Sequence, residues 1–329
     1  MDYPRMKTRQ TLLVMCVATL LFVSFIPQSD AASAFPSRPI TFYIPFSAGG
    51  AVDLMVRPVA GAASRILKQP VVVSNKPGGA ATLAPTMLKT MKPDGYNICC
   101  GMNNILFLPL QQEVAFEPLK DFTYICTVTD SILGIAVKSS SGWKTAKDFI
   151  AYAKANPGKI KYANSAGAGT PQHMAMSEVA LKEGIKWELV PYVGGVQSFA
   201  ALLGGHVQAA YGNILNITSY LKSGELTLLW VLAEERSKLY PNVPTLKELG
   251  FFSYSGPVGI IGPPGMPKDL VSFLDETFHK SLSDPEVEKT FKNTGAETCY
   301  MNSADYKKWA TESYARYADI IKKLGLEKK

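Results

Sequence analysis

The stretch Arg38-Pro-Ile-Thr-Phe-Tyr-Ile-Pro-Phe-Ser-Ala-Gly-Gly-Ala-Val-Asp53 decides the fold of this chain. Its first half, residues 40–46, is apolar and rich in β-branched and aromatic residues, which predicts a short strand. The residues Ser47-Ala48-Gly49-Gly50 then predict a sharp turn, because glycine adopts backbone angles that other residues avoid. From Ala51 onward, apolar residues recur at steps of three or four, which predicts a helix.

A strand, a glycine turn and the start of a helix together form a small cradle of backbone N–H groups. The positive end of the helix dipole lies behind these groups, so the cradle attracts an anion. The alternative is a tight turn without a ligand, and this stretch leaves both interpretations open. Asp53, in the first helical turn, is interpreted as complementing the helix dipole rather than as a catalytic base.

The first 34 residues have the pattern of a secretory signal peptide. Three basic residues precede an apolar run at residues 11–26, and Ala32-Ser33-Ala34 is a small-residue cleavage site. We therefore expect an exported, periplasmic protein that begins at Phe35. No other stretch approaches the roughly 18 apolar residues of a membrane-spanning helix.

Loss of this leader removes three basic and two acidic residues and lowers the formal net charge from +7 to +6. A mild basic excess suits an anionic small molecule. No basic run with interleaved aromatic residues indicates nucleic-acid binding. Cys126 is either a small buried hydrophobic residue or the partner of Cys99 or Cys100 in a disulfide.

Beyond the first helix, strand and helix patterns alternate, which predicts a parallel α/β sheet with right-handed crossovers. A second α/β unit follows in the middle of the chain. We expect domain 1 over residues 35–136, domain 2 over residues 137–254, and the completion of domain 1 over residues 255–329. A cleft between two such lobes is a natural ligand site.

A second cradle is predicted at Ser165-Ala-Gly-Ala-Gly-Thr-Pro-Gln-His173, which again follows a strand and opens a helix. Thr170 suits the N-cap and Pro171 the first helical position. Gln172 stands where the dinucleotide fingerprint requires its third glycine, so no nucleotide cofactor is expected. His173 either donates to an anion or is an ordinary surface residue. If the two cradles face each other, they can bind a dicarboxylate-like ligand at both ends.

The usual sequence motifs of hydrolases, P-loop proteins, zinc peptidases and dithiol redox proteins are absent from the sequence. Of the three histidines, His206 and His279 are interpreted as structural or solvent-facing. We therefore expect no catalytic residue, no metal and no cofactor.

Several segments carry a resemblance that covers nearly the whole mature chain in order. They include Phe35-Pro-Ser-Arg-Pro-Ile-Thr, Ile44-Pro-Phe-Ser-Ala-Gly-Gly-Ala-Val-Asp53, Asn75-Lys-Pro-Gly-Gly79, Pro93-Asp-Gly-Tyr96 and Gly167-Ala-Gly-Thr-Pro-Gln-His173. In these segments the chain resembles the Bug (TctC-like) solute receptors of tripartite tricarboxylate transporters. The resemblance implies a two-lobed periplasmic-binding-protein fold of type II, the Venus flytrap, with hinge strands between the lobes and no enzymatic activity.

In the family that the chain resembles, a small carboxylate is held largely by backbone amides and bound waters from two βα loops. The resemblance carries this role to particular residues here. In the first loop they are Phe46, Ser47, Ala48, Gly49, Gly50 and Asp53. In the second loop they are Ser165, Ala166, Gly167, Ala168, Gly169 and Thr170, together with His173.

Three departures from the family pattern fall where the resemblance places the lining of the cleft. Where the family often has a glycine-rich Gly-Gly-Asn-Ile-Gly run, Gly79 is followed here by Ala80-Ala81-Thr82-Leu83-Ala84. Tyr192 is followed by Val193 rather than by a basic residue, and Gly212-Asn213 replaces an Asp-Asn pair. Tyr192 and Asn213 are retained as candidate ligand-binding residues. We expect a pocket less polar than is usual in the family.

The resulting prediction is a periplasmic receptor that captures a small, carboxylated organic solute. It delivers this solute to the membrane subunits of a tripartite tricarboxylate-type transporter. We expect a monomer whose cleft closes on the ligand. Two alternatives stay open: a ligand-sensing co-receptor for a membrane signalling protein and, less favoured, an exported α/β enzyme.

Overall fold

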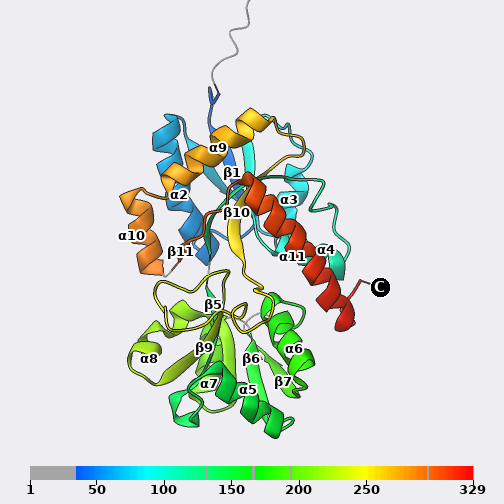
Figure 1. Cartoon of the computed structure of the whole chain (residues 1–329). Coiled ribbons are helices and arrows are strands. Elements are labelled where there is room, and N and C mark those ends of the chain that lie inside the picture. The colour runs from blue at the N-terminus through cyan, green and yellow to red at the C-terminus, as the bar shows by residue number, and fades with distance from the viewer. Residues whose placement is uncertain (1–34, 131, 165–166, 193–194, 295, 329) are drawn as a thin grey trace, which may run out of the picture. The chain divides into compact units, whose positions relative to one another are not determined.

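The computed structural model describes residues 35–130, 132–164, 167–192, 195–294 and 296–328. The predicted signal peptide, residues 1–34, lies outside the described residues, as do Ser165 and Ala166 of the second predicted cradle. Arg38–Lys329 forms one compact unit that contains two mixed β-sheets (Figure 1). None of the described helices combines the length and the apolar character that crossing a membrane requires.

The first sheet has the strand order β11-β4-β10-β3-β1-β2. Its strands are β1 (Ile40–Ile44), β2 (Val71–Asn75), β3 (Asn97–Gly101), β4 (Thr123–Asp130), β10 (Pro257–Gly262) and β11 (Glu297–Thr298). Because β1 runs parallel to both β2 and β3, the carboxyl ends of these three strands meet at one edge of the sheet. β10 and β11 pair antiparallel with β4, so the C-terminal part of the chain completes the first sheet.

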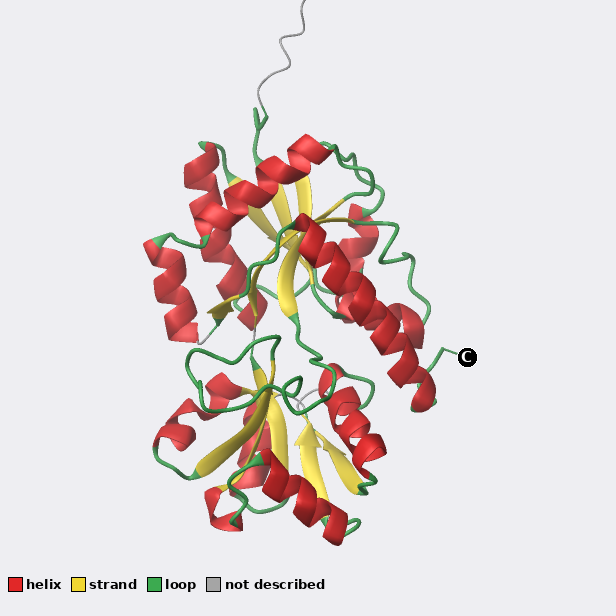
Figure 2. Ribbon diagram, in the orientation of Figure 1, coloured by secondary structure: helices red, strands yellow, loops and turns green. Residues whose placement is uncertain are grey.

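Helices flank the strands of this sheet (Figure 2). They are α2 (Ala51–Leu67), α3 (Leu83–Leu88), α4 (Asn104–Gln111), α9 (Lys268–Ser281), α10 (Pro285–Thr294) and α11 (Ser303–Lys323), with a 3₁₀ turn at Gly79–Ala81. α2 packs against α9 and α10, and α11 packs against α4 and β4. α2 shows the periodicity that the sequence predicts, since Val52, Met55, Val56 and Val59 are all buried.

The second sheet has the strand order β7-β6-β8-β5-β9. Its strands are β5 (Leu133–Lys138), β6 (Ile160–Asn164), β7 (Trp187–Pro191), β8 (Ala209–Asn213) and β9 (Leu226–Leu232). Its helices are α5 (Ala146–Ala155), α6 (Pro171–Glu183), α7 (Gly195–Leu203) and α8 (Thr218–Lys222), with 3₁₀ turns at Ser139–Ser141 and Ile214–Ile217. The chain enters this sheet between β4 and β5 and leaves it between β9 and β10.

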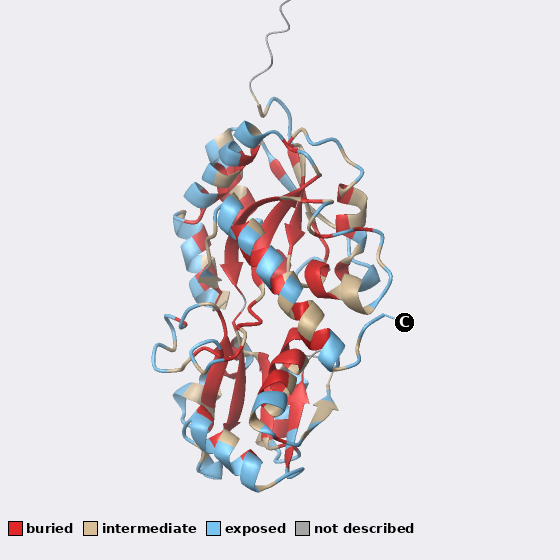
Figure 3. Cartoon of the chain, turned by 45° about the vertical axis from the view of Figure 1, so that its right-hand side comes forward, coloured by how far each residue is buried: buried red, intermediate tan, exposed pale blue. Residues whose placement is uncertain are grey.

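The central strands of both sheets are largely buried, the edge strands β2, β7 and β11 are partly exposed, and the outer faces of the helices are exposed (Figure 3). In the first sheet, Phe42 of β1 packs edge-on against Phe278 of α9. In the second sheet, Nε1 of Trp230 donates to the hydroxyl of the equally buried Tyr211 at 2.8 Å. This bond removes the cost of burying an indole N–H without a partner.

The structure decides one alternative that the sequence left open, and it contains one helix that the sequence pattern does not predict. Cys99, Cys100 and Cys126 are buried free thiols, so the disulfide alternative is not realised. The sequence pattern does not predict α4, because Ile105, Leu106 and Phe107 form a continuous apolar run without helical spacing. The domain boundaries at 136/137 and 254/255 stay predictions.

Candidate functional site

The first candidate loop joins β1 to α2 at the carboxyl edge of the first sheet. Ser47, Ala48 and Gly49 are exposed, whereas Phe46 and Gly50 are half-buried. Gly49 has φ +75°, a left-handed conformation that favours glycine. The glycine turn that the sequence predicts is therefore present.

Asp53 holds this loop in place from the first turn of α2. Its side chain is buried, and its Oδ2 accepts the N–H of Gly49 at 2.9 Å and Nε of Arg57 at 3.2 Å. Its Oδ1 accepts Nη2 of Arg57 at 2.6 Å and Nδ2 of Asn75 at 2.9 Å. Burial raises the pKa of Asp53, but the hydrogen bonds from Arg57, Gly49 and Asn75 outweigh it, so the pKa lies below its ordinary value. Both oxygens of the carboxylate are thus engaged in holding the loop.

The second candidate loop joins β6 to α6 and is described from Gly167 onward. Asn164, the buried last residue of β6, donates from Nδ2 to the carbonyl of Gly167 at 2.8 Å and to the Thr170 hydroxyl at 3.1 Å. Thr170 Oγ1 in turn donates to the carbonyl of Gly167 at 2.9 Å. Thr170 is the N-cap of α6, with Pro171 following, as the sequence predicts. Its hydroxyl makes no cap hydrogen bond, because it is engaged inside the loop.

His173 holds the second loop as Asp53 holds the first, by accepting a backbone N–H of the loop. Gly169 has φ +75°, and its N–H donates to Nδ1 of His173 at 3.1 Å. Since Nδ1 accepts a hydrogen bond, the neutral ring carries its proton on Nε2. Burial lowers the pKa of His173, which favours this neutral ring. His173 is therefore half-buried and paired with the loop, not an ordinary surface residue.

The two loops share one device: a left-handed glycine donates its N–H to a side chain four residues later. The N–H groups of Gly49 and Gly169 are therefore occupied, which differs from the predicted cradles of free amides. The remaining donors are backbone N–H groups in the first turns of the two helices. The N-cap residues Gly50 and Thr170 make no side-chain hydrogen bond to α2 and α6. By contrast, α5 carries a complete capping box. The first turn of α2, and that of α6 after Pro171, therefore have backbone N–H groups that no N-cap side chain accepts.

Tyr192 and Asn213 lie at the same edge of the second sheet as the second loop. β6 pairs in parallel with β7 and β8, and Asn164 stands opposite Pro191 on one side and Tyr211 on the other. The backbone N–H of Tyr192 donates to the carbonyl of Asn164 at 3.0 Å. The carboxyl edge of parallel strands is where open α/β sheets bind ligands.

Three further residues shape the two loops although the sequence analysis does not single them out for a role. Asn75 and Asn164 end strands and bind the loops through their amide groups. An asparagine at the end of a strand beside a glycine turn is the signal that could have indicated them. Gln111, at the end of α4, donates from Nε2 to the carbonyl of Gly169 at 2.8 Å.

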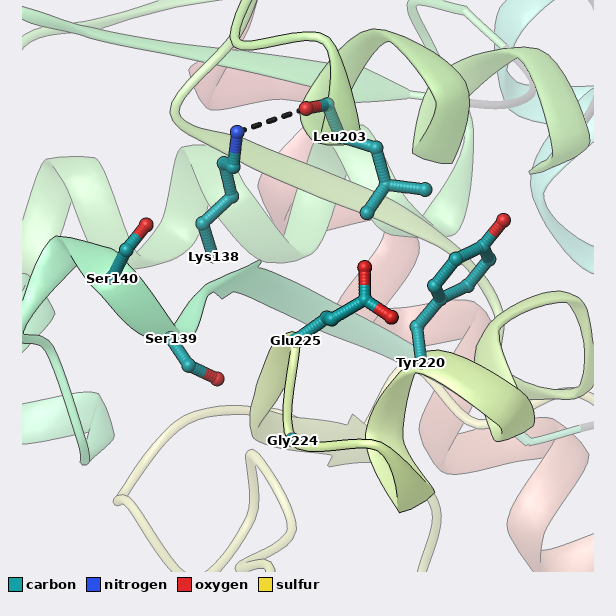
Figure 4. A pocket seen from close by; sticks show the side chains of 7 residues that line it. All are labelled: Lys138, Ser139, Ser140, Leu203, Tyr220, Gly224 and Glu225. Atoms are coloured by element: carbon teal, nitrogen blue, oxygen red, sulfur yellow. Dashed lines mark hydrogen bonds between the residues drawn. The ribbon is translucent and has the colours of Figure 1, made fainter.

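A separate pocket lies in the second sheet between the end of β5 and the helices α7 and α8 (Figure 4). Its two charged side chains are already paired: Lys138 Nζ donates to the carbonyl of Leu203 at 2.8 Å, and Glu225 accepts from Ser223. It lies at the edge of the sheet opposite Asn213, so we do not assign it to the site. Among the described residues, no group of histidine, cysteine and acidic side chains is arranged to hold a metal ion.

Two mixed α/β sheets, with the chain passing between them twice and βα loops at their carboxyl edges, define a periplasmic-binding-protein fold of type II. Residues 55–326 match the profile described as "Tripartite tricarboxylate transporter family receptor", TctC. The chain belongs to this family, which comprises binding proteins rather than enzymes. The resemblance and the fold class predicted from the sequence are therefore confirmed.

Similar proteins span nearly the whole chain. A Cupriavidus necator protein described as "UPF0065 protein in gbd 5'region" is 38% identical over 94% of this chain and 94% of its own length. A TctC solute-binding protein from Polaromonas has a TM-score of 0.81 at 27% identity and covers 88% of this chain and 99% of its own. The periplasmic binding protein BugD has a TM-score of 0.67 at 29% identity and covers 90% of this chain and 100% of its own.

Two further structures share the fold and were solved with carboxylates. An R. palustris protein, Rpa4515, contains adipate and has a TM-score of 0.70 at 24% identity, covering 90% of this chain and all of its own. MatC from Rhodopseudomonas palustris contains malate and has a TM-score of 0.64 at 23% identity, covering 87% of this chain and all of its own.

Proposed function

We propose that this protein is an extracytoplasmic receptor that captures a small carboxylated solute and delivers it to a tripartite tricarboxylate-type transporter. The observation that carries the proposal is the pair of uncapped helix starts at α2 and α6. Each follows a loop whose glycine is locked by a side chain, so the loops are held in shape before a ligand arrives. Such preorganisation lowers the ordering cost of binding.

The proposed ligand-binding residues are those of the two loops, with their roles divided. Backbone groups of the first loop, Phe46 to Gly50, with the first turn of α2, and of the second loop, Ser165 to Thr170, with the first turn of α6, contact the carboxylate groups. The N–H groups of Gly49 and Gly169 stay engaged with Asp53 and His173. Asp53 and His173 hold the loops, and Nε2 of His173 remains as a donor. Tyr192 and Asn213 line the same site from the ends of β7 and β8. The carboxylates adipate and malate, found in two structures of the same fold, support this ligand class.

The ligand class is tested by mass spectrometry of small molecules released from the purified protein, followed by a thermal-shift screen. The screen contains mono- and dicarboxylates, including adipate and malate. We expect a saturable rise in melting temperature with at least one carboxylate, since a ligand at a hundred times its Kd stabilises by about 2.7 kcal/mol. Release of a cationic or neutral solute, with no response to any carboxylate, would overturn the proposal.

The role of the first helix start is tested by Ala51→Pro. Proline at the first helical position keeps the helix and removes one N–H, and Gly50 already has the extended ψ of 167° that a residue before proline requires. If this N–H binds a carboxylate, the affinity for the carboxylate found in the screen falls roughly tenfold to hundredfold. The matched control is Lys268→Pro at the first position of α9, where Pro267 has ψ 139°. Equal affinities in the two variants would remove α2 from the site.

Delivery to a transporter needs its own experiment. Deletion of the transporter's membrane subunits in the native bacterium should abolish uptake of the carboxylate identified above. Intact uptake, together with a transcriptional response that needs this receptor, would favour the sensing alternative instead.

A further inference from the structure

The second candidate loop is held by elements of both sheets at a single residue, Gly169. Its N–H donates to Nδ1 of His173, on the loop's own helix, at 3.1 Å. Its carbonyl accepts Nε2 of Gln111 at 2.8 Å. Gln111 is the last residue of α4, which directly follows β3 of the first sheet. Because a carbonyl only accepts hydrogen bonds, it selects the amide orientation of Gln111 with Nε2 toward Gly169.

The side chain of Gln111 also packs closely against the Cα of Gly169. A Cβ added at Gly169 would lie 3.0 Å from Nε2 and 3.3 Å from Oε1 of Gln111. Gly169 itself has φ +75°, a backbone conformation that residues with a side chain rarely adopt. The loop therefore presents its carbonyl to Gln111 in a defined direction.

Other elements of the first sheet contact the helix that this loop begins. Glu178 of α6 is buried and accepts a hydrogen bond from Arg316 of α11. The same carboxylate accepts the N–H of Phe252, on the segment that returns to the first sheet, at 3.2 Å. Buried side chains of α4, α6 and α11 belong to one hydrophobic cluster. The loop and helix that carry the candidate anion site are thus contacted by α4 at the start and by α11 further along.

We infer that Gln111 is a positioning residue that holds the second loop against the first-sheet helix α4 before any ligand binds. It does not contact the ligand in this proposal; it acts through Gly169. The consequence for binding rests on the proposed function. The apparent affinity of a receptor scales with the fraction of molecules in the binding-competent arrangement. Loss of this one neutral hydrogen bond should therefore weaken binding roughly twofold to tenfold.

The test uses three substitutions at or beside this position. Gln111→Met keeps the length of the side chain and removes the donor, whereas Gln111→Lys restores a donor. Gln112→Met is the control, because Gln112 is the next residue, exposed, at the C-cap of α4. The first measurement is hydrogen–deuterium exchange of the purified protein without ligand, read on peptides that cover residues 167–176.

We expect faster exchange of these peptides in Gln111→Met, by roughly twofold to tenfold. Exchange should be unchanged in Gln112→Met and restored towards the unsubstituted protein in Gln111→Lys. Exchange of peptides elsewhere in the chain should stay the same in all three, which separates positioning from a general loss of stability. If Gln111→Met exchanges like Gln112→Met, the positioning role is overturned.

The second measurement is calorimetric titration with adipate as the probe. Weaker binding in Gln111→Met, with rescue in Gln111→Lys, supports the link between loop position and ligand affinity. If even the unsubstituted protein fails to bind adipate or any carboxylate in the screen, the proposed function fails while the exchange result still decides the role of Gln111.

Discussion

Asp53 and His173 perform the same geometric task with different chemistry. Each accepts the N–H of a left-handed glycine four residues earlier, Gly49 in one loop and Gly169 in the other. Asp53 is a carboxylate whose charge is balanced by Arg57, with Nη2 2.6 Å from Oδ1. His173 accepts only while its ring is neutral. The two loops should therefore respond differently to substitution and to pH.

Removal of the Asp53 charge should loosen the first loop. In Asp53→Asn one acceptor oxygen becomes an NH₂ group that faces the donors of Arg57, Gly49 or Asn75. We expect a loss of roughly 1–3 kcal/mol in the free energy of unfolding, measured by urea denaturation, because the buried side chain at position 53 would then place a donor against groups from which it now accepts. Asp94→Asn is the control, since Asp94 forms a surface ion pair with Arg38 at 3.4 Å that is worth less than about 1 kcal/mol. Equal losses in both variants would contradict the role assigned to Asp53.

The stability that His173 contributes should depend on pH. An imidazole in the unfolded chain has a pKa of about 6.5, and burial places the pKa of His173 lower in the folded protein. The unfolded state then binds more protons in this window, so stability is complete above pH 6.5 and falls as the pH drops below it. We expect the melting temperature to decline between pH 7 and pH 5, and to decline less in His173→Asn. In His206→Asn, at an exposed position, the melting temperature should decline as much as in the unsubstituted protein. An equally large decline in His173→Asn would refute the assignment.

At the scale of elements, α6 is both the start of the candidate anion site and the helix to which α11 attaches. The attachment is a buried carboxylate, Glu178, paired with Arg316 of α11 and with Lys182 of its own helix at 3.0 Å. Burial raises the pKa of Glu178, but the hydrogen bond from Lys182, the charge of Arg316 and the N–H of Phe252 outweigh it and lower the pKa. The carboxylate is therefore charged at neutral pH, and its stabilising contribution is lost only as the pH falls below about 4.5.

Arg316→Met should destabilise the protein through this buried charge. We expect roughly 2–4 kcal/mol in urea denaturation, toward the lower figure because Lys182 and the N–H of Phe252 still contact Glu178. The double variant Glu178→Met/Arg316→Met should recover much of this loss, since a buried ion pair replaced by apolar side chains is often neutral. A double variant less stable than Arg316→Met alone would show that the pair itself, and not the unpaired charge, supplies the stability.

At the scale of the whole molecule, the chain builds one sheet, passes into the second and returns to complete the first. Residues 38–329 form one compact unit. The described residues of the candidate site all belong to this unit, and the leader over residues 1–34 stays a prediction.

Export should leave a chain that begins at Phe35. When the full sequence is produced in a bacterial host, we expect the protein in the periplasmic fraction, with Phe35 as its first residue by N-terminal sequencing. Arginine at both Ala32 and Ala34 should block cleavage, because the site requires small residues there, and the longer chain should stay with the membrane fraction. A periplasmic protein that retains residues 1–34 would contradict the leader assignment.

The sequence by itself determined the local pieces: the strand, glycine turn and helix start at Ser47–Gly50, the similar turn before Thr170, and the alternation that gives two α/β sheets. These features depend on backbone preference and apolar spacing over a few residues, which a sequence displays directly. The family resemblance followed from the same local motifs, in order along the chain.

Only the tertiary structure decided which groups in those pieces are available for a ligand. It showed that the N–H groups of Gly49 and Gly169 are occupied. It also showed that Gln111 reaches a loop 58 residues away and that Arg316 pairs with Glu178 across 138 residues. The physical reason is that a buried polar group must find a partner wherever the packing of the sheets places one. Such partners are set by contacts between distant segments, and neither composition nor spacing along the chain records them.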